Sequence, residues 1–440
     1  MIKAKPPGPN AKSWIERWEL CGSKPPRYQT AFSSGKGVYL EDIDGNRYLD
    51  LTATTCNIGH TQPKISDAVI HQLKKSGVEG FRYGVHGLRV LLAEKIKRIV
   101  PAGLAMGKVA FCTTGSDATE FAMKLARAYT RRQILFSYMG SHHGYSMGAL
   151  SLTADYSINK RYCLPLVPSI LHIPYPYCYR CYFGQVYPEC SLQCLDFIRY
   201  VLNTAAHPDE VAAIFLEPIQ QIGGVVIPPK EYFVELRKIC DKYQILLVDD
   251  EVATGFGRTG RMFAIDHWGI TPDMMYIGKP IANGIALAAI IAKKEIMDAE
   301  ENLKMILGGS FVGNLIACTS ALTTIEVIEE EKLVKNSRQI GSYAAKRLNE
   351  MAERHKLIGD VRGMGLLIGV ELVRDEKRPA RRAAERLVLE GFRRGLLLAN
   401  VGTYQNVIRL APPLVITKEQ AGEALDIIEE IFKGLSGKTM

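Results

Sequence analysis

The sequence has no long apolar run. Its longest uncharged apolar stretch, 285–292, has about eight positions, whereas a helix needs about 20 to span a bilayer. The opening residues MIKAKPPGPNAKSW contain nothing that resembles the apolar part of a signal peptide. Internal repeats and low-complexity tracts are also missing. We therefore expect a cytoplasmic protein that does not act at a membrane.

Charge of one sign is not concentrated in any part of the chain. The 55 basic and 46 acidic residues give a net charge of +9 but are mixed along the sequence. The densest basic cluster, 377–387, is typical of a solvated helix face. A mildly basic protein also suits small anionic ligands. We therefore do not expect nucleic acid as a partner.

The length of the chain and the order of its apolar segments indicate an α/β protein. A chain of 440 residues, 47% of them hydrophobic, exceeds what one core usually covers, so two domains are expected. Strand-like runs alternate with helical patterns over 109–278, which predicts a mainly parallel sheet with helices on both faces. After residue 313, helical patterns over 317–331 and 332–355 lead into further strand-like runs. This part predicts a smaller α+β domain.

Three residues with reactive side chains stand at the ends of strand-like runs: Glu217, Asp250 and Lys279. Ligands of parallel sheets bind beyond the carboxyl ends of the strands. An amine among apolar neighbours loses its proton more readily, and only the neutral amine attacks an aldehyde to form a Schiff base. A carboxylate can keep a basic ring nitrogen protonated. Lys279 and Asp250 therefore fit a cofactor with an aldehyde and a ring nitrogen, although a solvated lysine and a turn-capping carboxylate are the ordinary interpretations.

A possible phosphate site lies at Thr114, Gly115 and Ser116, between a strand-like run and a helical pattern. Backbone N–H groups at the start of a helix favour anions, and a glycine allows close approach. An ordinary strand–helix turn capped by Ser116 would have the same sequence. The phosphate interpretation gains weight only together with Lys279 and Asp250.

A second glycine pattern, Gly255 to Gly260, matches the GxGxxG motif of dinucleotide-binding proteins. Its context does not fit, because polar residues separate it from the preceding strand-like run. No clear helix follows it, and no acidic residue stands about 20 positions further on. We therefore do not expect a nicotinamide cofactor.

Several segments, in this order, resemble the class III (omega-type) pyridoxal-phosphate aminotransferases, and 4-aminobutyrate aminotransferases in particular. The resemblance covers nearly the whole chain and is carried by the segments 38–51, 59–60, 111–130, 214–220, 245–260, 272–289, 308–318, 361–372 and 407–417. It implies a fold-type I pyridoxal-phosphate enzyme, a homodimer whose active site is shared between subunits. It also implies an N-terminal segment (1–60) that packs with the small domain, a large cofactor-binding domain (61–312) and a small C-terminal domain (313–440).

The resemblance also assigns roles to residues. Lys279 would hold pyridoxal 5'-phosphate as a Schiff base and move the proton, and Asp250, which precedes Glu-Val, would pair with the ring nitrogen in preference to Asp249. The other implied cofactor-binding residues are Thr114, Gly115 and Ser116 at the phosphate, Ser310 reaching the phosphate of the other subunit, His142 and Val252 on the two ring faces, and Glu217. Arg409 matches the arginine that binds the substrate's α-carboxylate.

The sequence departs from the family pattern where the substrate is recognised. Tyr145 stands where enzymes that use glutamate as donor have an arginine, and Ile222 stands where they have the glutamate that masks the carboxylate-binding arginine. Ala253 replaces a glutamine, and the segment between Asp50 and Gly59 is about two residues shorter than usual. These departures put standard 2-oxoglutarate recognition in question.

Four of the ten cysteines, Cys178, Cys181, Cys190 and Cys194, stand close together. The spacing CxxC followed by CxxxC is compatible with a four-cysteine zinc site, with two disulfides, or with free thiols. A reducing cytosol disfavours disulfides. In each case we expect a loop staple away from the reaction.

The expected activity is transfer of an amino group from an ω-amino acid such as 4-aminobutyrate to a keto acid. An amino-acid racemase, epimerase or aminomutase on the same fold is the alternative, because such enzymes need no second keto acid. A binding protein without catalytic activity would leave Lys279 and Asp250 without a purpose.

Overall fold

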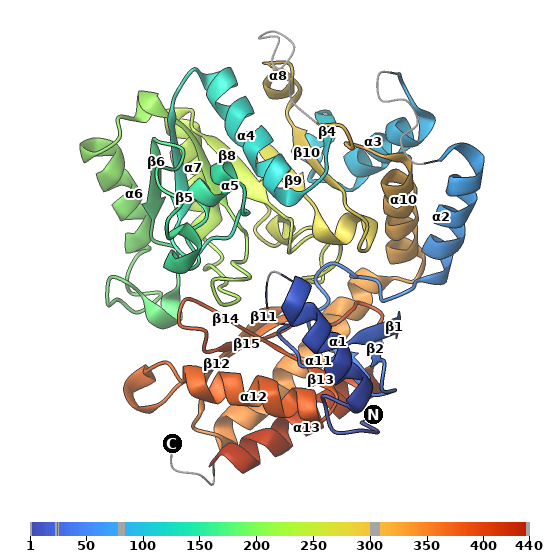
Figure 1. Ribbon diagram of the computed structural model, residues 1–440. Coiled ribbons are helices and arrows are strands. Elements are labelled where there is room, and N and C mark those ends of the chain that lie inside the picture. Colours follow the sequence, from blue (N-terminus) through green and yellow to red (C-terminus); the bar gives the residue numbers. More distant parts are fainter. Residues whose placement is uncertain (1, 23, 25, 78–83, 300–308, 437–440) are drawn as a thin grey trace.

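The computed structural model describes residues 2–22, 24, 26–77, 84–299 and 309–436 (Figure 1). Its centre is a seven-stranded sheet with the order β4-β10-β9-β8-β7-β5-β6. The strands are β4 (Lys108–Cys112), β5 (Ile134–Tyr138), β6 (Ile170–Ile173), β7 (Val211–Leu216), β8 (Leu246–Asp250), β9 (Met274–Ile277) and β10 (Ala288–Ala292). Strands β5 to β9 pair in parallel, and β10 runs antiparallel to both of its neighbours. The predicted α/β class and mainly parallel sheet are therefore confirmed.

Both faces of this sheet are buried, because neighbouring residues of a strand point to opposite sides. Leu247 of β8 packs into a core with Phe233 of helix α7 (Tyr232–Tyr243). The next residue, Val248, packs into a separate core with Phe121 of helix α4 (Gly115–Thr130). Helices thus cover both faces of the sheet. The carboxyl ends of its strands remain as the place where reactive side chains can meet a ligand.

Two four-stranded sheets lie below the main sheet in Figure 1. One has the order β1-β2-β3-β13, from Phe32–Lys36, Tyr39–Asp42, Arg47–Asp50 and Leu396–Leu397, so it joins the N-terminal segment to a late part of the chain. The other has the order β11-β12-β15-β14, from Ile358–Met364, Leu367–Leu372, Val407–Leu410 and Ala399–Val401. The ring of Tyr48 stacks on Phe392 with centroids 5.1 Å apart, which seals the first sheet against helix α12.

The remaining helices surround these sheets. They are α1 (Pro9–Cys21), α2 (Pro63–Ser76), α3 (Gly87–Ile99), α5 (Met147–Leu152), α6 (Gln193–Thr204), α8 (Lys294–Met297), α10 (Leu315–Glu330), α11 (Leu333–Arg354), α12 (Arg381–Arg393) and α13 (Lys418–Ser436). Helices α10 and α11 agree with the two helical patterns expected after residue 313. Within the described residues, no helix has both the length and the apolar character needed to cross a membrane.

A buried arginine ties the main sheet to the lower part of the molecule. Arg258 is 1% exposed, and its Nη1 donates hydrogen bonds to the carbonyl oxygens of Leu366, 3.0 Å away, and Pro412. Its Nη2 donates to the carbonyl oxygen of Ala53 at 2.8 Å and to Oδ1 of Asn57 at 2.6 Å. The Gly255–Gly260 loop thus forms a structural joint, because the guanidinium of Arg258 donates hydrogen bonds to acceptors from three other segments.

We expect that replacing Arg258 by methionine lowers the free energy of unfolding by about 3 kcal/mol or more, since several buried acceptors would lose their donor. Urea denaturation checks this value. The exposed neighbour Arg261 is the matched control, because Arg261→Met removes a similar side chain from the surface. Equal stability of the Arg258→Met variant and the wild type would contradict the assignment of this joint.

Candidate active site

The carboxyl ends of β7, β8 and β9 bring together Glu217, Asp250 and Lys279, as the strand pattern predicts. Strand β7 ends one residue before Glu217, β8 ends at Asp250, and β9 ends two residues before Lys279. Since these strands are neighbours in the sheet, the three side chains face one site. Glu217 and Asp250 both act electrostatically on Lys279.

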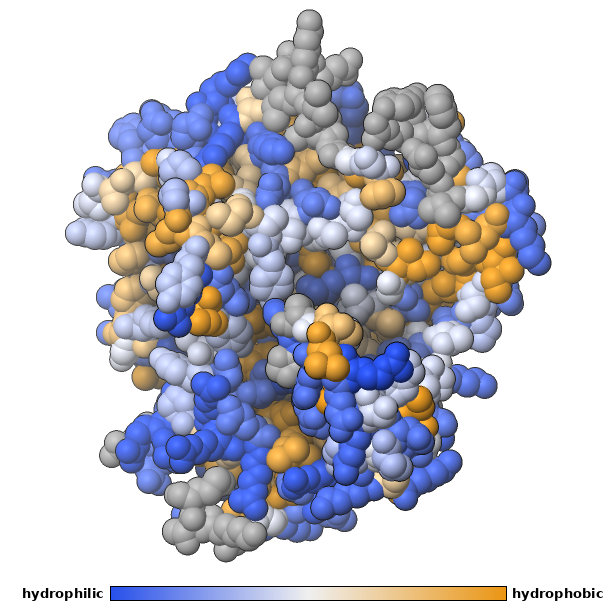
Figure 2. Space-filling model, in the orientation of Figure 1, coloured by the Kyte–Doolittle hydropathy of each residue, from blue (hydrophilic) through white to orange (hydrophobic). Residues whose placement is uncertain are grey.

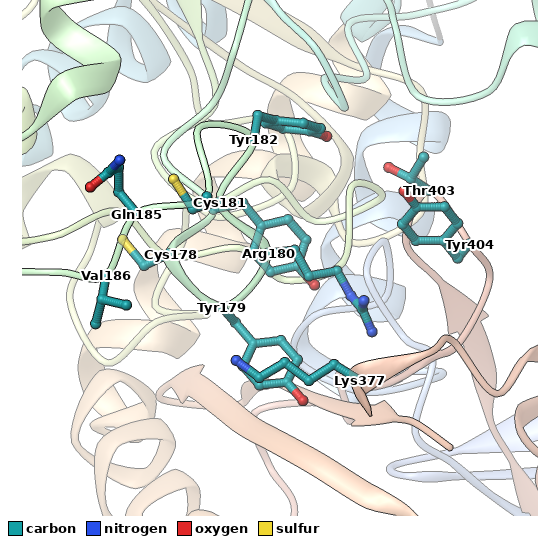
Figure 3. Close-up of a pocket in the computed structure, with 12 residues that line it drawn as sticks. Cys178, Tyr179, Arg180, Cys181, Tyr182, Gln185, Val186, Lys377, Thr403 and Tyr404 are labelled. Carbon is teal, nitrogen blue, oxygen red and sulfur yellow. The ribbon is translucent and has the colours of Figure 1, made fainter. Parts of the chain in front are cut away.

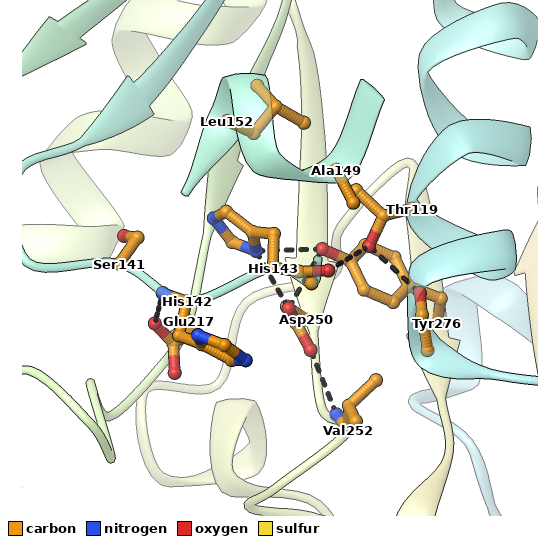
Figure 4. Close-up of polar contacts among 12 residues, drawn as sticks. Thr119, Ser141, His142, His143, Ala149, Leu152, Glu217, Asp250, Val252 and Tyr276 are labelled. Carbon is orange, nitrogen blue, oxygen red and sulfur yellow. Dashed lines mark hydrogen bonds and ion pairs between the residues drawn. The ribbon is translucent and has the colours of Figure 1, made fainter. Parts of the chain in front are cut away.

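Asp250 is the centre of a buried hydrogen-bond network (Figure 4). Its Oδ2 lies 2.7 Å from Nδ1 of His143 and accepts a hydrogen bond from the Tyr276 hydroxyl at 2.9 Å. Its Oδ1 accepts the backbone N–H of Val252 at 3.0 Å. Burial first, and then the charge of Asp250, raise the pKa of Tyr276 well above its ordinary value, so the phenol stays a donor. This network fixes the orientation of the carboxylate.

The sequence analysis missed His143 and Tyr276. The signal for Tyr276 was present, because a tyrosine inside the apolar strand Met274–Ile277 needs a partner for its hydroxyl group. His143 could not be distinguished from its neighbour His142 by spacing alone.

Asp249 differs from Asp250 although the two are adjacent. Successive residues of a strand point to opposite faces, so Asp249 turns away from the site. Both of its carboxyl oxygens are buried and have no hydrogen-bond partner among the described residues. Burial, followed by the charges of Glu251 and Asp250, raises the pKa of Asp249 well above its ordinary value. Asp249 therefore favours the neutral form more than an exposed carboxyl group does, and it lies on the other face of the strand.

Lys279 combines an unusual backbone with a perturbed amine. Its φ of 36° is in the left-handed region, which a residue with a Cβ occupies only when its surroundings hold it there. Burial lowers the pKa of its amine, while Asp250 and Glu217 oppose this shift and Arg409 adds to it. The amine thus loses its proton more easily than a surface lysine, as attack on an aldehyde requires.

Val252 connects the Lys279 segment to the start of helix α4. A methyl group added to Gly115 would lie 3.1 Å from Cγ1 of Val252, and one added to Gly278 would lie 3.4 Å from it. Only small residues fit against this side chain. The predicted phosphate loop, the valine and the glycine before Lys279 are therefore in one place.

The start of α4 has the form of an anion site. Thr114 caps the helix by accepting the N–H of Asp117, and the Asp117 carboxyl group accepts the N–H of Thr114. The hydroxyl oxygen of Ser116 accepts the N–H of Tyr145 at 3.2 Å. The N–H groups of Gly115 and Ser116 are thus at the first turn, where the helix dipole favours an anion.

Arg409 lies in β15, beneath the site. It is 7% exposed, and its Nε has no hydrogen-bond partner within the described part of the chain. Burial, with Arg27 adding to it, lowers the pKa of its guanidinium to about 10. The backbone carbonyl of Ile222 accepts a hydrogen bond from the N–H of Gly402. Gly402 directly follows β14, the strand that pairs with the Arg409 strand β15. An unpaired buried guanidinium of this kind fits a carboxylate ligand.

Ser310 is exposed. Its expected contact is with the phosphate bound by another subunit, and this contact stays a prediction. Gly308, in the same motif, lies outside the described residues.

The cysteine loop lies at a separate cavity of about 470 Å³ (Figure 3). Cys178 and Cys181 line it with several tyrosines, whereas all four cysteines of the motif are free thiols. Among the described residues, no three His, Cys, Asp or Glu side chains are arranged to hold a metal ion. The zinc and disulfide alternatives for Cys178, Cys181, Cys190 and Cys194 are therefore not formed in this structure.

The chain is similar to known proteins over most of its length. Residues 23–432 match the family model "Aminotransferase class-III". The alanine/serine racemase of Pyrococcus horikoshii is 39% identical, covering 99% of this chain and 94% of that protein. The leucine/methionine racemase of Thermococcus litoralis is 41% identical over 90% of this chain and 88% of that protein. The 4-aminobutyrate aminotransferase GabT of Escherichia coli is 35% identical over 89% and 90%.

A solved structure of an amine transaminase from an uncultivated Pseudomonas species, in its PLP-bound form, has a TM-score of 0.87. It is 32% identical and covers 92% of this chain and 95% of that chain. The protein described here therefore belongs to the class-III aminotransferases, and its fold is the fold-type I α/β architecture. Its cofactor is pyridoxal 5'-phosphate.

The residues of the site fit this cofactor. A partly buried amine of lowered pKa, an anchored carboxylate and a helix start with available N–H groups correspond to its aldehyde, ring nitrogen and phosphate. Lys279 would hold the aldehyde carbon, Asp250 the ring nitrogen, and Gly115 and Ser116 the phosphate. When bound, pyridoxal phosphate supplies an electron-accepting ring next to the reacting carbon.

We expect that Tyr276→Phe weakens binding of pyridoxal phosphate and lowers turnover by about tenfold. The change removes one hydrogen bond to a charged group, worth about 1.5–3 kcal/mol. Titration of the cofactor-free protein by fluorescence measures the binding part. Tyr138→Phe is the matched control, because its hydroxyl group is also buried but pairs with Tyr232 at 3.0 Å. Equal effects of the two changes would show that the Asp250 contact is unimportant.

Proposed function

We propose that this protein is a pyridoxal-phosphate-dependent racemase or epimerase of neutral α-amino acids. The observation that carries the proposal is the buried guanidinium of Arg409, whose Nε has no hydrogen-bond partner among the described residues, with Ile222 where related enzymes have a masking glutamate. The similarity to racemases that act on alanine, serine, leucine and methionine supports the same conclusion.

A carboxylate site without a mask suits a reaction with one kind of substrate. An aminotransferase alternates between a donor and an acceptor, and one that accepts both 4-aminobutyrate and glutamate must provide for two carboxylate positions. Here no acidic side chain covers Arg409 from the loop of Ile222, and Tyr145 offers no cation for a second carboxylate. The two enantiomers of an α-amino acid share the α-carboxylate, so a permanently available arginine serves both.

Arg409, Lys279 and Asp250 would each have a separate role in the reaction. Arg409 binds the α-carboxylate through its guanidinium. Lys279, once displaced by the substrate amine, takes a proton from the α-carbon with its neutral Nζ. Asp250, held by His143 and Tyr276, keeps the ring nitrogen protonated so that the ring accepts the electron pair.

The test is an enantiomer assay without any keto acid. The purified protein, loaded with pyridoxal phosphate, is incubated with L-alanine, L-leucine or L-methionine, and chiral chromatography follows the product. We expect each reactive amino acid to reach an equal mixture of its enantiomers, and Lys279→Ala to be inactive. An enantiomer that persists until a keto acid is added would contradict racemisation.

Amino-group transfer is the second candidate, favoured by the 35% identity to a 4-aminobutyrate aminotransferase. In that case an ω-amino acid or related amine donates its amino group through Lys279, and a keto acid accepts it. Stoichiometric release of a carbonyl product, dependent on the added keto acid, identifies this activity. The chain would then need a carboxylate-binding group in place of the arginine that Tyr145 replaces.

We further propose a homodimer with a shared active site. Exposed apolar residues gather on α2 and α3, namely Ile70, Leu73, Val90 and Leu91, and Figure 2 shows apolar surface on the side where Figure 1 draws α2. A patch of this kind fits a protein–protein interface. Sedimentation of the wild type and of Leu73→Glu checks the proposal. We expect a dimer for the wild type and a monomer for the variant, and a monomeric wild type would contradict the proposal.

A further inference from the structure

The pair His142 and Asp155 has the geometry of a proton-transfer group. Nδ1 of His142 lies 2.9 Å from Oδ2 of Asp155, and its side chain is 13% exposed while that of Asp155 is 2% exposed. Burial opposes ionisation of Asp155. The hydrogen bond and charge of His142, with a further bond from the N–H of Tyr156, nevertheless hold the pKa of that carboxyl group below its ordinary value. The buried carboxylate at Nδ1 therefore fixes the orientation of the imidazole ring.

The second nitrogen of this ring is available. Among the described residues, none hydrogen-bonds to Nε2 of His142, and this atom is not enclosed by protein. The backbone N–H of His142 donates to Oε1 of Glu217 at 2.8 Å, so the residue is held at the carboxyl end of the sheet. Figure 4 shows the imidazole ring beside the Glu217 carboxyl group. The carboxylate thus fixes the Nδ1–H tautomer and leaves Nε2 to carry a proton.

We propose that His142 is the second acid/base residue of the racemase, on the side of the substrate opposite Lys279, with Asp155 as its positioning residue. This inference rests on the proposed function, since only inversion at the α-carbon requires a proton group on both sides. Val252 belongs to the Lys279 side, because it packs against Gly278. His142 comes from the loop after β5, and its imidazole ring would lie on the face of the cofactor ring opposite Val252.

Glu217 is the other proton group beside His142, because burial raises the pKa of its carboxyl group well above the ordinary value. Ile222 has no proton to give. The carboxyl oxygens of Glu217 are engaged by the N–H groups of His142 and Gln221. Tyr145 is 68% exposed and meets His142 edge-on, with ring centroids 4.8 Å apart.

The step balances as two proton transfers. Nζ of Lys279 takes the α-proton of one enantiomer and becomes an ammonium group, while the electron pair of the C–H bond stays with the bound substrate. Nε2–H of His142 then gives its proton to the opposite side of the same carbon, forms the new C–H bond and becomes neutral. Exchange with water restores both groups, and the reverse direction uses them with exchanged roles.

The test compares His142→Phe with the wild type in deuterium oxide. Phenylalanine keeps a flat ring but carries no proton. For the wild type we expect racemisation with deuterium entering the α-position of both enantiomers. For His142→Phe we expect racemisation to fall by about 100-fold or more. Exchange of the α-proton should persist for the one enantiomer whose proton faces Lys279. Asp155→Asn should reduce racemisation by about tenfold or more.

A binding measurement separates placement of the ring from its chemistry. We expect His142→Phe to bind pyridoxal phosphate within about threefold of the wild type, and His142→Ala to bind it about tenfold more weakly, since a stacked ring contributes about 1 kcal/mol. Racemisation by His142→Phe at the wild-type rate, or unchanged cofactor affinity of His142→Ala, would overturn the inference. If the wild type itself inverts no amino acid, the proposed racemase function is wrong, and the inference about His142 is wrong with it.

Discussion

Replacement of Lys279 by alanine is expected to lower turnover by about 10⁴-fold, the largest effect of any single change in the site. The variant loses the amine that holds the cofactor and the base that moves the α-proton. Because Asp250 and the start of α4 remain, pyridoxal phosphate should still bind, but without a covalent bond. Gel filtration should therefore remove it from the variant and not from the wild type.

The matched control is Lys242→Ala, which removes an exposed lysine of α7. Its turnover and cofactor retention should equal those of the wild type. Addition of a small primary amine to Lys279→Ala should restore part of the activity, since the amine replaces the missing base. Turnover by Lys279→Ala above about 1% of the wild type, without such an amine, would contradict the role of Lys279.

Asp250→Asn is expected to reduce turnover by about 10³-fold while leaving the cofactor bound to Lys279. The amide keeps the size of the side chain but removes the charge that holds the ring nitrogen protonated. The asparagine side chain also carries an NH2 group, so its hydrogen bonds to Nδ1 of His143 and to the hydroxyl group of Tyr276 differ from those of the carboxylate. The protein should stay yellow, because the loss concerns the acceptance of electrons and not the attachment of the cofactor.

Asp249→Asn is the control for this change. Asp249 is adjacent and buried, and burial raises the pKa of its carboxyl group well above the usual value. An amide of the same size should therefore leave turnover within about threefold of the wild type. If the two variants lost activity to the same extent, the assignment of Asp250 as the ring partner would be wrong.

Strands β4, β5, β7, β8 and β9 of the main sheet could be predicted because each is a short apolar run, whereas β6 and β10 were not predicted. Lys279 and Asp250 could be singled out because they end such runs. The choice of Asp250 over Asp249 needed the family resemblance, and its physical reason, the opposite directions of two adjacent strand residues, appears only in the structure. Strand-like runs were expected after residue 355, but the pairing of strands in the two small sheets could not be predicted, since one of them pairs Arg47–Asp50 with Leu396–Leu397.

Polar networks between distant segments were also beyond the sequence. His143 and Asp250 are 107 positions apart, and Tyr276 is 26 positions from Asp250. No local period connects such residues, so only the packed fold brings them together. The cysteine motif left three alternatives open from its spacing, and in this structure Cys178, Cys181, Cys190 and Cys194 are free thiols.

The most direct test of this account is the position at which pyridoxal phosphate attaches. The yellow protein is reduced with borohydride, digested and mapped by mass spectrometry. We expect one phosphopyridoxyl group, on Lys279, and none on Lys242 or on any other lysine. A reduced adduct at another position, or no adduct on a protein that is active with the cofactor, would contradict the central claim.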